Sequence, residues 1–116
     1  MQTTTDITSI LSNFKIDNLN EMQMASLEAF NTHNDIILIS ATGSGKTLAF
    51  LLPVTGQLKK DFKKVQCIII VPSRELAIQI DDVFRKMQTG FKVSLCYGGH
   101  KREIEEQNLV QAPAVI

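Results

Sequence analysis

The fold of this chain is decided by the stretch Ser40-Ala41-Thr42-Gly43-Ser44-Gly45-Lys46-Thr47. The apolar run 36–39 precedes it and the helix-like run 48–52 follows it. The layout is therefore strand, glycine-rich loop and helix, with Gly-Lys-Thr at the end of the loop, which is typical of a P-loop. One departure is visible, because the strict pattern has glycine where this chain has Ser40.

The residue types of this stretch suit a nucleoside triphosphate with Mg²⁺. Glycine allows backbone angles closed to other residues, and successive N–H groups at the start of a helix form an anion-binding nest. Lys46 would contact the β- and γ-phosphates, and the hydroxyl of Thr47 would bind Mg²⁺, so these two carry the catalytic assignment. The expected nucleotide contacts are Thr42, Gly43, Ser44, Gly45, Lys46 and Thr47. The alternative is a plain glycine turn with a solvated lysine.

Composition bounds the other possibilities. At 116 residues the chain is one small domain or part of a larger one. Its 44% hydrophobic and 21% charged content is that of a globular protein, which argues against disorder. The formal net charge is zero, so nucleic-acid binding requires a local surface. The lysines at 59, 60, 63 and 64 form a run that Asp61 interrupts, and such runs usually serve solubility.

The two cysteines, Cys67 and Cys96, lie far apart in apolar runs. This favours buried free thiols in a reducing compartment over a disulfide or a metal site. No apolar run approaches the roughly 18–20 residues that span a bilayer, and no secretory signal is apparent. The expectation is a cytoplasmic protein without a membrane segment.

Hydrophobic periodicity predicts alternating helices and strands. The first two expected helices are residues 6–14, capped by Asp6, and 21–31, capped by Asn20. A buried helix is expected from residue 48, and Pro53 should kink it or begin its end. Two further helices are expected, one that Ser73 caps and Gly90 closes, and one over residues 101–109. The expected strands are 36–39, 67–71, 93–97 and 114–116, the first two buried on both faces. The fold class is therefore α/β, a doubly wound parallel sheet with flanking helices.

The last residues, Ala114-Val115-Ile116, resemble the start of an apolar strand. We expect the chain to be a fragment whose sheet is incomplete, with apolar surface exposed or shared with a partner chain.

Three further segments resemble DEAD-box RNA helicases. Gln23 precedes the P-loop lysine by the interval expected in that family. Pro72-Ser73-Arg74-Glu75-Leu76-Ala77 is similar to the family's Pro-Thr-Arg-Glu-Leu-Ala motif, and Tyr97-Gly98-Gly99 is similar to its glycine doublet. The continuation Ala49-Phe50-Leu51-Leu52-Pro53 also resembles the family. The resemblance covers nearly the whole chain and implies a truncated first RecA-like domain, residues 1–116, with its Q motif.

The resemblance implies roles for individual residues. Gln23 would read adenine through its side-chain amide, although the spacing from Asn20 also suits a capping box. Residues 1–13 lack the aromatic that the family stacks on adenine, and Leu19-Asn20-Glu21 replaces its Pro-Thr-Pro. The RNA-backbone contacts would be Ser73, Arg74, Gly98 and Gly99. A plain helix cap and a plain turn are the alternatives at these positions.

The implied activity is that of an ATP-dependent RNA helicase that unwinds or remodels RNA with ATP and Mg²⁺. No Asp-Glu-Ala-Asp sequence occurs in the chain, and the family's catalytic arginines come from a second RecA-like domain. The chain alone is therefore expected to bind nucleotide, and RNA through backbone contacts, without hydrolysis. A DNA helicase or translocase of the same superfamily, or a P-loop kinase or GTPase, remain alternatives.

Overall fold

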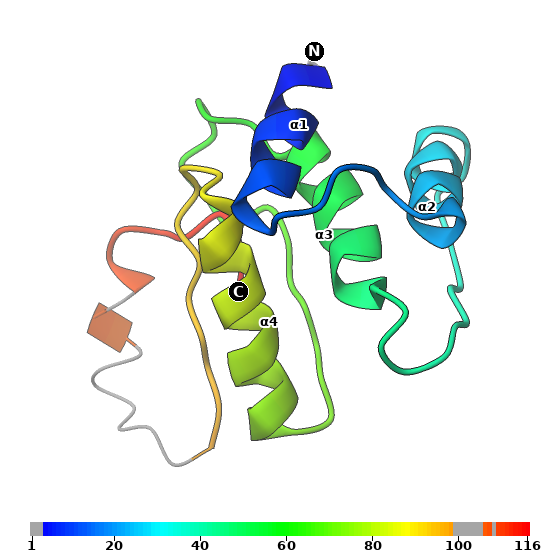
Figure 1. The fold of residues 1–116 in the computed structure, drawn as a ribbon. Helices are drawn as coiled ribbons and strands as arrows, with labels where there is room; N and C mark the ends of the chain where they lie inside the picture. Colours follow the sequence, from blue (N-terminus) through cyan, green and yellow to red (C-terminus); the bar gives the residue numbers. More distant parts are fainter. Residues whose placement is uncertain (1–3, 99–105, 108) are drawn as a thin grey trace. The chain divides into compact units, whose positions relative to one another are not determined.

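The computed structural model describes residues 4–98, 106–107 and 109–116. The chain forms two compact units, Met1–Gln57 and Leu58–Ile116. The described residues of the first unit contain α1 (Thr4–Asn13), α2 (Glu21–Thr32) and α3 (Lys46–Gln57), and those of the second contain α4 (Arg74–Met87) (Figure 1). None of these helices is long and apolar enough to cross a bilayer.

The capping of α2 follows the sequence prediction. Asn20 is the N-cap, and its side chain and that of Gln23 accept each other's backbone N–H in a complete capping box. The helix ends at Thr32, one residue later than predicted. The prediction for α1 is wrong at its start, because the helix begins at Thr4 and Asp6 lies inside its first turn.

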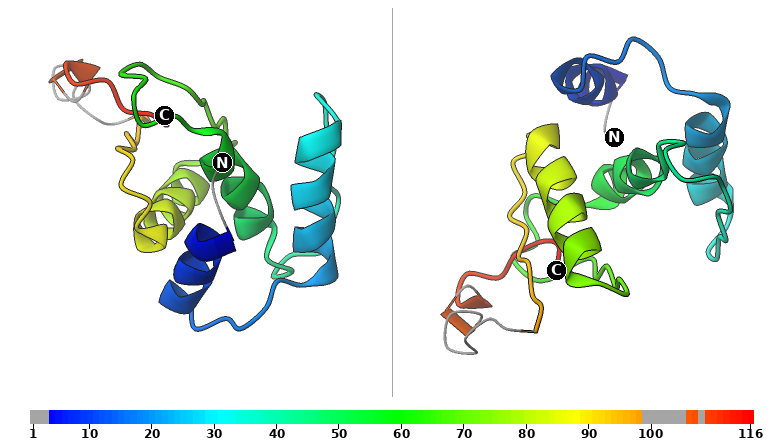
Figure 2. Two further views of the ribbon diagram at one scale, coloured as in Figure 1. Left: turned by 90° about the horizontal axis from the view of Figure 1, so that it is seen from above. Right: turned by 60° about the horizontal axis from the view of Figure 1, so that its bottom comes forward.

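Helix α3 is buried, as predicted, and continues four residues beyond Pro53. A proline lacks the N–H that would bond the carbonyl four residues earlier, which here belongs to Ala49. The hydroxyl of Ser26 in α2 donates to that carbonyl at 2.6 Å in a buried position. The freed acceptor is thus satisfied from the neighbouring helix, and the helix does not end at Pro53. Figure 2 shows α2 and α3 side by side.

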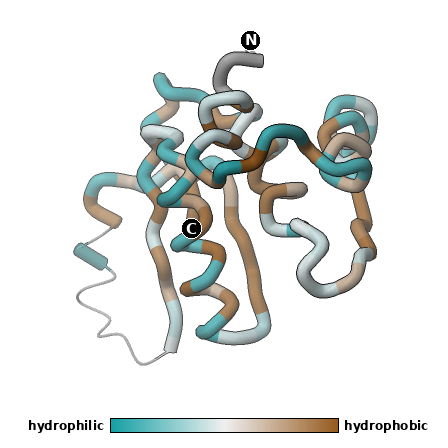
Figure 3. Tube along the Cα trace, viewed as in Figure 1, coloured by the Kyte–Doolittle hydropathy of each residue, from teal (hydrophilic) through white to brown (hydrophobic). Residues whose placement is uncertain are grey.

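Residues 36–39 lead into the P-loop in an extended form without an assigned strand. Ile37 and Ile39 are 90% and 88% exposed, whereas Ile36 and Leu38 are half-buried. This period of two is that of an extended chain covered on one side only. The predicted burial on both faces is therefore wrong for this segment, and for 67–71, where Ile70 is also 90% exposed. Figure 3 shows the apolar character of both runs.

In the second unit three of the predicted strands are joined in parallel through Val115. Isolated bridges link it to Cys67 on one side and to Val93 on the other. The Ser94 N–H donates to the Val115 carbonyl at 2.9 Å, and the Ile69 N–H donates to the Ile116 carbonyl at 2.7 Å. The order 67–71, 114–116, 93–97 follows from these bonds. The described residues contain no assigned strand, so the doubly wound sheet stays a prediction.

Helix α4 covers these segments with an apolar face. Ser73 caps it by accepting the Leu76 N–H at 3.2 Å, as predicted. The predicted end at Gly90 is wrong: Gln88 ends the helix in the left-handed conformation at φ 53°. The predicted helix 101–109 lies mostly outside the described residues.

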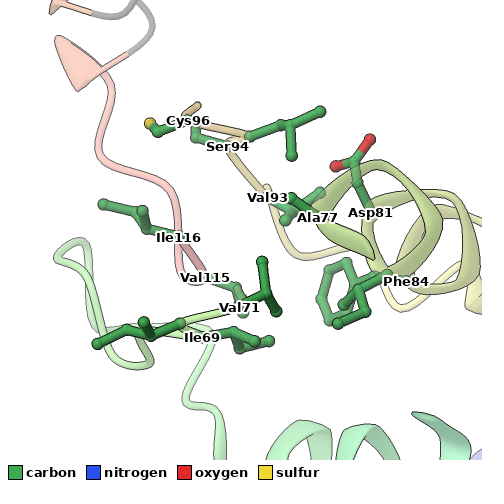
Figure 4. A pocket seen from close by; sticks show the side chains of 13 residues that line it. Ile69, Val71, Ala77, Asp81, Phe84, Val93, Ser94, Cys96, Val115 and Ile116 are labelled. Atoms are coloured by element: carbon green, nitrogen blue, oxygen red, sulfur yellow. The ribbon is translucent and has the colours of Figure 1, made fainter. Parts of the chain in front are cut away.

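A cavity of about 260 Å³ lies between α4 and the extended segments. Figure 4 shows Phe84 of α4 facing Val71 and Val115. Asp81 also lines the cavity from α4, with its side chain only 11% exposed. One of its carboxylate oxygens pairs with Arg85 Nε at 2.9 Å. The other is buried without a hydrogen-bond partner among the described residues. The carboxylate lies among apolar side chains, which makes this position a weak point in the packing.

Candidate functional site

The P-loop is shaped by two glycines in a backbone region that disfavours other residues. Gly43 has φ +79° and Gly45 has φ +90°. A Cβ at Gly43 would meet no atom within 4 Å, whereas at Gly45 it would lie 2.6 Å from Gln23 Nε2. The first glycine is therefore needed for its backbone angle alone. The second is needed both for its angle and for the close approach of the loop to α2.

Gln23 joins the start of α2 to the end of the loop. Its Oε1 accepts the Asn20 N–H at 3.0 Å, and its Nε2 donates to the Gly45 carbonyl at 3.2 Å. The side chain is 4% exposed. The capping-box alternative raised by the sequence is thus present, and it comes with a contact to the P-loop that the spacing did not reveal.

Asn20 and Ser40 hold the loop from either side, although sequence reasoning gave neither a role in its shape. The Asn20 Nδ2 donates to the Ser44 carbonyl at 2.9 Å, and Ser40 Oγ donates to Ser44 Oγ at 2.7 Å. The Lys46 ammonium donates to the Ser40 carbonyl at 2.6 Å. The serine at the position where the strict motif has glycine thus uses its side chain to fix the loop. The sequence signal for this role was the departure from the strict P-loop pattern, serine in place of glycine at position 40.

The P-loop leads directly into the N-terminus of α3, where backbone N–H groups are available as donors. The helix begins at Lys46, and the Gly45 carbonyl accepts the Ala49 N–H at 3.1 Å. The N–H groups of the first turn have no partner within the helix, and the helix dipole places positive potential there. That turn holds no acidic residue, and Thr42 and Gly43 before it are exposed.

These donors match the chemistry of a triphosphate. Backbone N–H groups and the Lys46 ammonium suit phosphate oxygens, and the hydroxyl of Thr47, in the same turn, suits a hard cation such as Mg²⁺. Across the described part of the chain, no three His, Cys, Asp or Glu side chains gather into a metal-binding group. The site that sequence predicted from Thr42 to Thr47 is thus one continuous loop and helix start in the first unit.

The predicted RNA contacts lie in the second unit. Ser73 and Arg74 follow the segment 67–71, and Gly98 follows 93–97, so parallel pairing brings them to one edge. The Arg74 guanidinium lies over the Tyr97 ring, 5.6 Å from its centroid, which links the two loops. Gly98 is exposed and has open space where a side chain would be. Gly99 lies outside the described residues.

The cysteines differ from the prediction. Both are free, Cys67 is half-buried, and Cys96 is exposed, so the expectation of two buried thiols is wrong for Cys96. Burial raises the pKa of the Cys67 thiol above its ordinary value. The apolar run around Cys96 does not reveal which of its positions are covered: Ser94 is buried, whereas Cys96 two residues later is exposed.

Comparison with known proteins is consistent across sequence and structure. The chain is 37% identical over 97 residues to an ATP-dependent rRNA helicase, RRP3, from Encephalitozoon cuniculi, covering 83% of this chain and 24% of that protein. It is 33% identical over 117 residues to the ATP-dependent RNA helicase DeaD of Buchnera aphidicola, covering 91% of this chain and 20% of that protein.

A solved structure supports the fold. The crystal structure of a DEAD box protein from the hyperthermophile Methanococcus jannaschii matches with a TM-score of 0.87 at 26% identity, over 100% of this chain and 32% of that one. The model of the DEAD/DEAH box helicase family matches residues 20–116, which include the P-loop and the Pro-Ser-Arg-Glu-Leu-Ala segment. The chain therefore belongs to the DEAD/DEAH box helicase family.

Proposed function

We propose that this chain is the nucleotide-binding part of an ATP-dependent RNA helicase and that its P-loop binds ATP with Mg²⁺. The observation that carries the proposal is the loop of Gly43 and Gly45, both at positive φ, leading directly into α3 at Lys46. The names of the relatives, which are ATP-dependent RNA and rRNA helicases, support the choice of ATP and RNA. We place the chain in a doubly wound RecA-like domain and in the cytoplasm.

Within the site, Lys46 would neutralise the β- and γ-phosphates and Thr47 would bind the Mg²⁺. When bound, that cation supplies charge neutralisation and orientation of the phosphates. Gln23 would contact adenine with the capacity its present bonds leave over, one lone pair on Oε1 and one hydrogen on Nε2. The capping box therefore leaves bonding capacity for adenine, and the contact would require the loop to uncover Gln23, which is 4% exposed.

RNA would contact the edge formed by Ser73, Arg74, Gly98 and Gly99. A capped helix N-terminus, a guanidinium and an exposed glycine turn are donors that bind phosphate without reading bases. The stack of Arg74 on Tyr97 would hold the guanidinium in position. A second RecA-like domain would complete the cleft and supply the arginines that hydrolysis needs. This chain alone would then bind nucleotide with no multiple turnover.

The proposal is tested by titrating a fluorescent ATP analogue into the chain with Mg²⁺ and by measuring phosphate release. We expect Lys46→Ala to abolish saturable binding, while the exposed lysine variant Lys64→Ala binds as the parent does. Binding that Lys46→Ala leaves intact would refute the assignment of the site. Phosphate release at helicase-like turnover would refute the claim that this chain lacks hydrolysis.

Two competition experiments separate the alternatives. A GTPase would prefer GTP, and a kinase would transfer phosphate to a small acceptor. The proposed function predicts instead that unlabelled GTP displaces the analogue less well than ATP does and that no such transfer occurs. A DNA translocase reading predicts that single-stranded DNA is bound at least as well as RNA of the same length.

A further inference from the structure

A basic groove lies in the second unit, outside the edge assigned to RNA above. Its volume is about 700 Å³. The side chains that define it are four lysines and two phenylalanines: Lys59, Lys60, Lys63, Lys92, Phe62 and Phe91. No Asp or Glu side chain is among the described residues that line it. The sequence showed a lysine run that contains Phe62 and is interrupted by Asp61; the fold adds Phe91 and Lys92 from a distant segment.

The loop that carries most of these residues is held in shape by Gln66. Its Oε1 accepts the Lys59 N–H at 2.8 Å, and its Nε2 donates to the Lys59 and Phe62 carbonyls at 2.8 and 3.2 Å. One side chain therefore ties both ends of the loop, and the groove residues are partly ordered in advance. Such preorganisation lowers the entropic cost of binding a ligand.

The charge of the groove is concentrated. The lysines at 59, 60 and 63 are exposed, and the Lys92 ammonium is fixed by donating to the Gln111 carbonyl at 2.6 Å. These four cations, against the single exposed carboxylate of Asp61 in the same loop, form a local positive surface on a chain with no net charge. A polyanion with regularly spaced charges is the complementary ligand.

An aromatic ring stands among these cations. Phe62 is 50% exposed, although burying its ring elsewhere would be favourable. Lysines that track a backbone and an exposed ring on which a base can stack are the two components of sequence-independent single-strand binding. An acidic peptide would use the lysines but not the ring, so the aromatic favours a nucleic acid.

The groove lies at the opposite edge from Arg74. Residues 59–66 precede the extended segment 67–71, and Lys92 precedes 93–97, whereas Ser73, Arg74 and Gly98 follow these segments. At about 3.3 Å per residue, the two edges are roughly 20 Å apart. That exceeds a Debye length of about 10 Å at moderate salt, so the two surfaces act independently on a charged ligand.

We propose that this groove is a second binding surface for single-stranded RNA, with phosphates on Lys59, Lys60 and Lys63 and a base stacked on Phe62. The choice of RNA as the nucleic acid rests on the proposed function; the cationic and stacking surface does not. The strand would then contact both edges of the second unit and not only the edge that carries Arg74 and Gly98.

The test measures fluorescence anisotropy of a labelled oligouridylate bound to the full chain at several salt concentrations. We expect the triple variant Lys59→Ala/Lys60→Ala/Lys63→Ala to weaken binding and to lower the salt slope by about 2, since each phosphate contact on a single strand contributes roughly 0.7. Phe62→Ala should weaken binding roughly 5- to 150-fold, as expected for the loss of one stacked base, while Phe62→Tyr retains it. Lys64→Ala, on the neighbouring exposed lysine outside the groove lining, is the matched control and should bind as the parent does.

Several results would overturn the proposal. One is unchanged affinity in the triple variant with intact circular dichroism. Another is a loss of affinity as large in Lys64→Ala as in a groove lysine variant, which would indicate a diffuse charge effect. Polyglutamate that competes as well as RNA, together with no effect of Phe62→Ala, would assign the groove to acidic peptides instead. Arg74→Ala separates the two proposals. If RNA affinity falls in Arg74→Ala but not in the groove variants, this inference is wrong and the proposed function stands. If affinity falls only in the groove variants, the assignment of RNA to the edge with Arg74 is wrong and the groove stands.

Discussion

The replacement Gly45→Ala should damage the nucleotide site far more than Gly43→Ala, although the two glycines are two residues apart. Both have positive φ, so both substitutions carry backbone strain of about 1–3 kcal/mol. Only at Gly45 would the new Cβ lie 2.6 Å from Gln23 Nε2. The glutamine side chain would have to move, and because its amide is the end of a flexible side chain, the cost is set by the hydrogen bonds that it gives up.

Moving Gln23 breaks two hydrogen bonds at once, to the Gly45 carbonyl and from the Asn20 N–H. Each is worth about 0.5–1.5 kcal/mol, and more where the freed group stays buried. We therefore expect Gly45→Ala to lower the free energy of unfolding by about 2–6 kcal/mol, against about 1–3 kcal/mol for Gly43→Ala.

The assay is a double-mutant cycle followed by urea unfolding with circular dichroism, combined with titration of a fluorescent ATP analogue. In a Gln23→Ala background the clash is absent, so the cost of Gly45→Ala should fall to that of Gly43→Ala. An equal cost of Gly45→Ala in both backgrounds would refute the reasoning. It would mean that backbone strain alone explains the need for glycine.

Three other predictions concern packing and thiol chemistry. Ser26→Ala removes the donor to a buried helix carbonyl and should lower the free energy of unfolding by about 1–3 kcal/mol. The exposed Ser12→Ala, which also removes a serine-to-carbonyl bond, is the control and should change it by less than about 0.5 kcal/mol; equal effects in urea unfolding would contradict this. Asp81→Leu replaces a buried oxygen without a described partner and fills part of the adjoining cavity, so the melting temperature should rise; a fall would show that its ion pair outweighs the burial. Cys96 should react with a thiol reagent before Cys67, whose raised pKa keeps it protonated. The reaction rate of Cys67, read by mass spectrometry, should keep rising with pH beyond 9.0, the ordinary pKa of a thiol. The stability that Cys67 contributes to the fold should be lost over the same pH range, because the folded state holds the thiol proton more tightly than the unfolded state does. A rate that levels off below that pH would contradict the raised pKa.

The helices and the P-loop could be predicted because their signals are local. The cap at Asn20, the cap at Ser73 and the two glycines at positive φ each follow from a residue and its immediate neighbours. The resemblance then supplied the family, since the motifs occur in the family's order over most of the chain.

The remaining features depend on segments far apart in the sequence. The exposure of Ile37 and Ile39 depends on what covers an extended segment, which an apolar run does not encode. The helical continuation through Pro53 depends on a hydroxyl from α2, more than twenty residues away. The basic groove likewise gains Lys92 only when the chain has folded. Sequence therefore predicted the chemistry of the proposed site but not the contacts that hold its loop in place.

The hydrogen bond from Ser26 to the Ala49 carbonyl makes the effect of a substitution at position 26 depend on the residue at position 53. With proline at 53, loss of the serine hydroxyl leaves a carbonyl in the interior with nothing to accept from. With alanine at 53, the backbone supplies that donor itself and the hydroxyl becomes redundant. The same serine replacement is thus harmful or nearly harmless according to the residue at position 53. A search for stabilising substitutions in this helix pair has to change the proline first and the serine second, because the reverse order passes through an unstable intermediate.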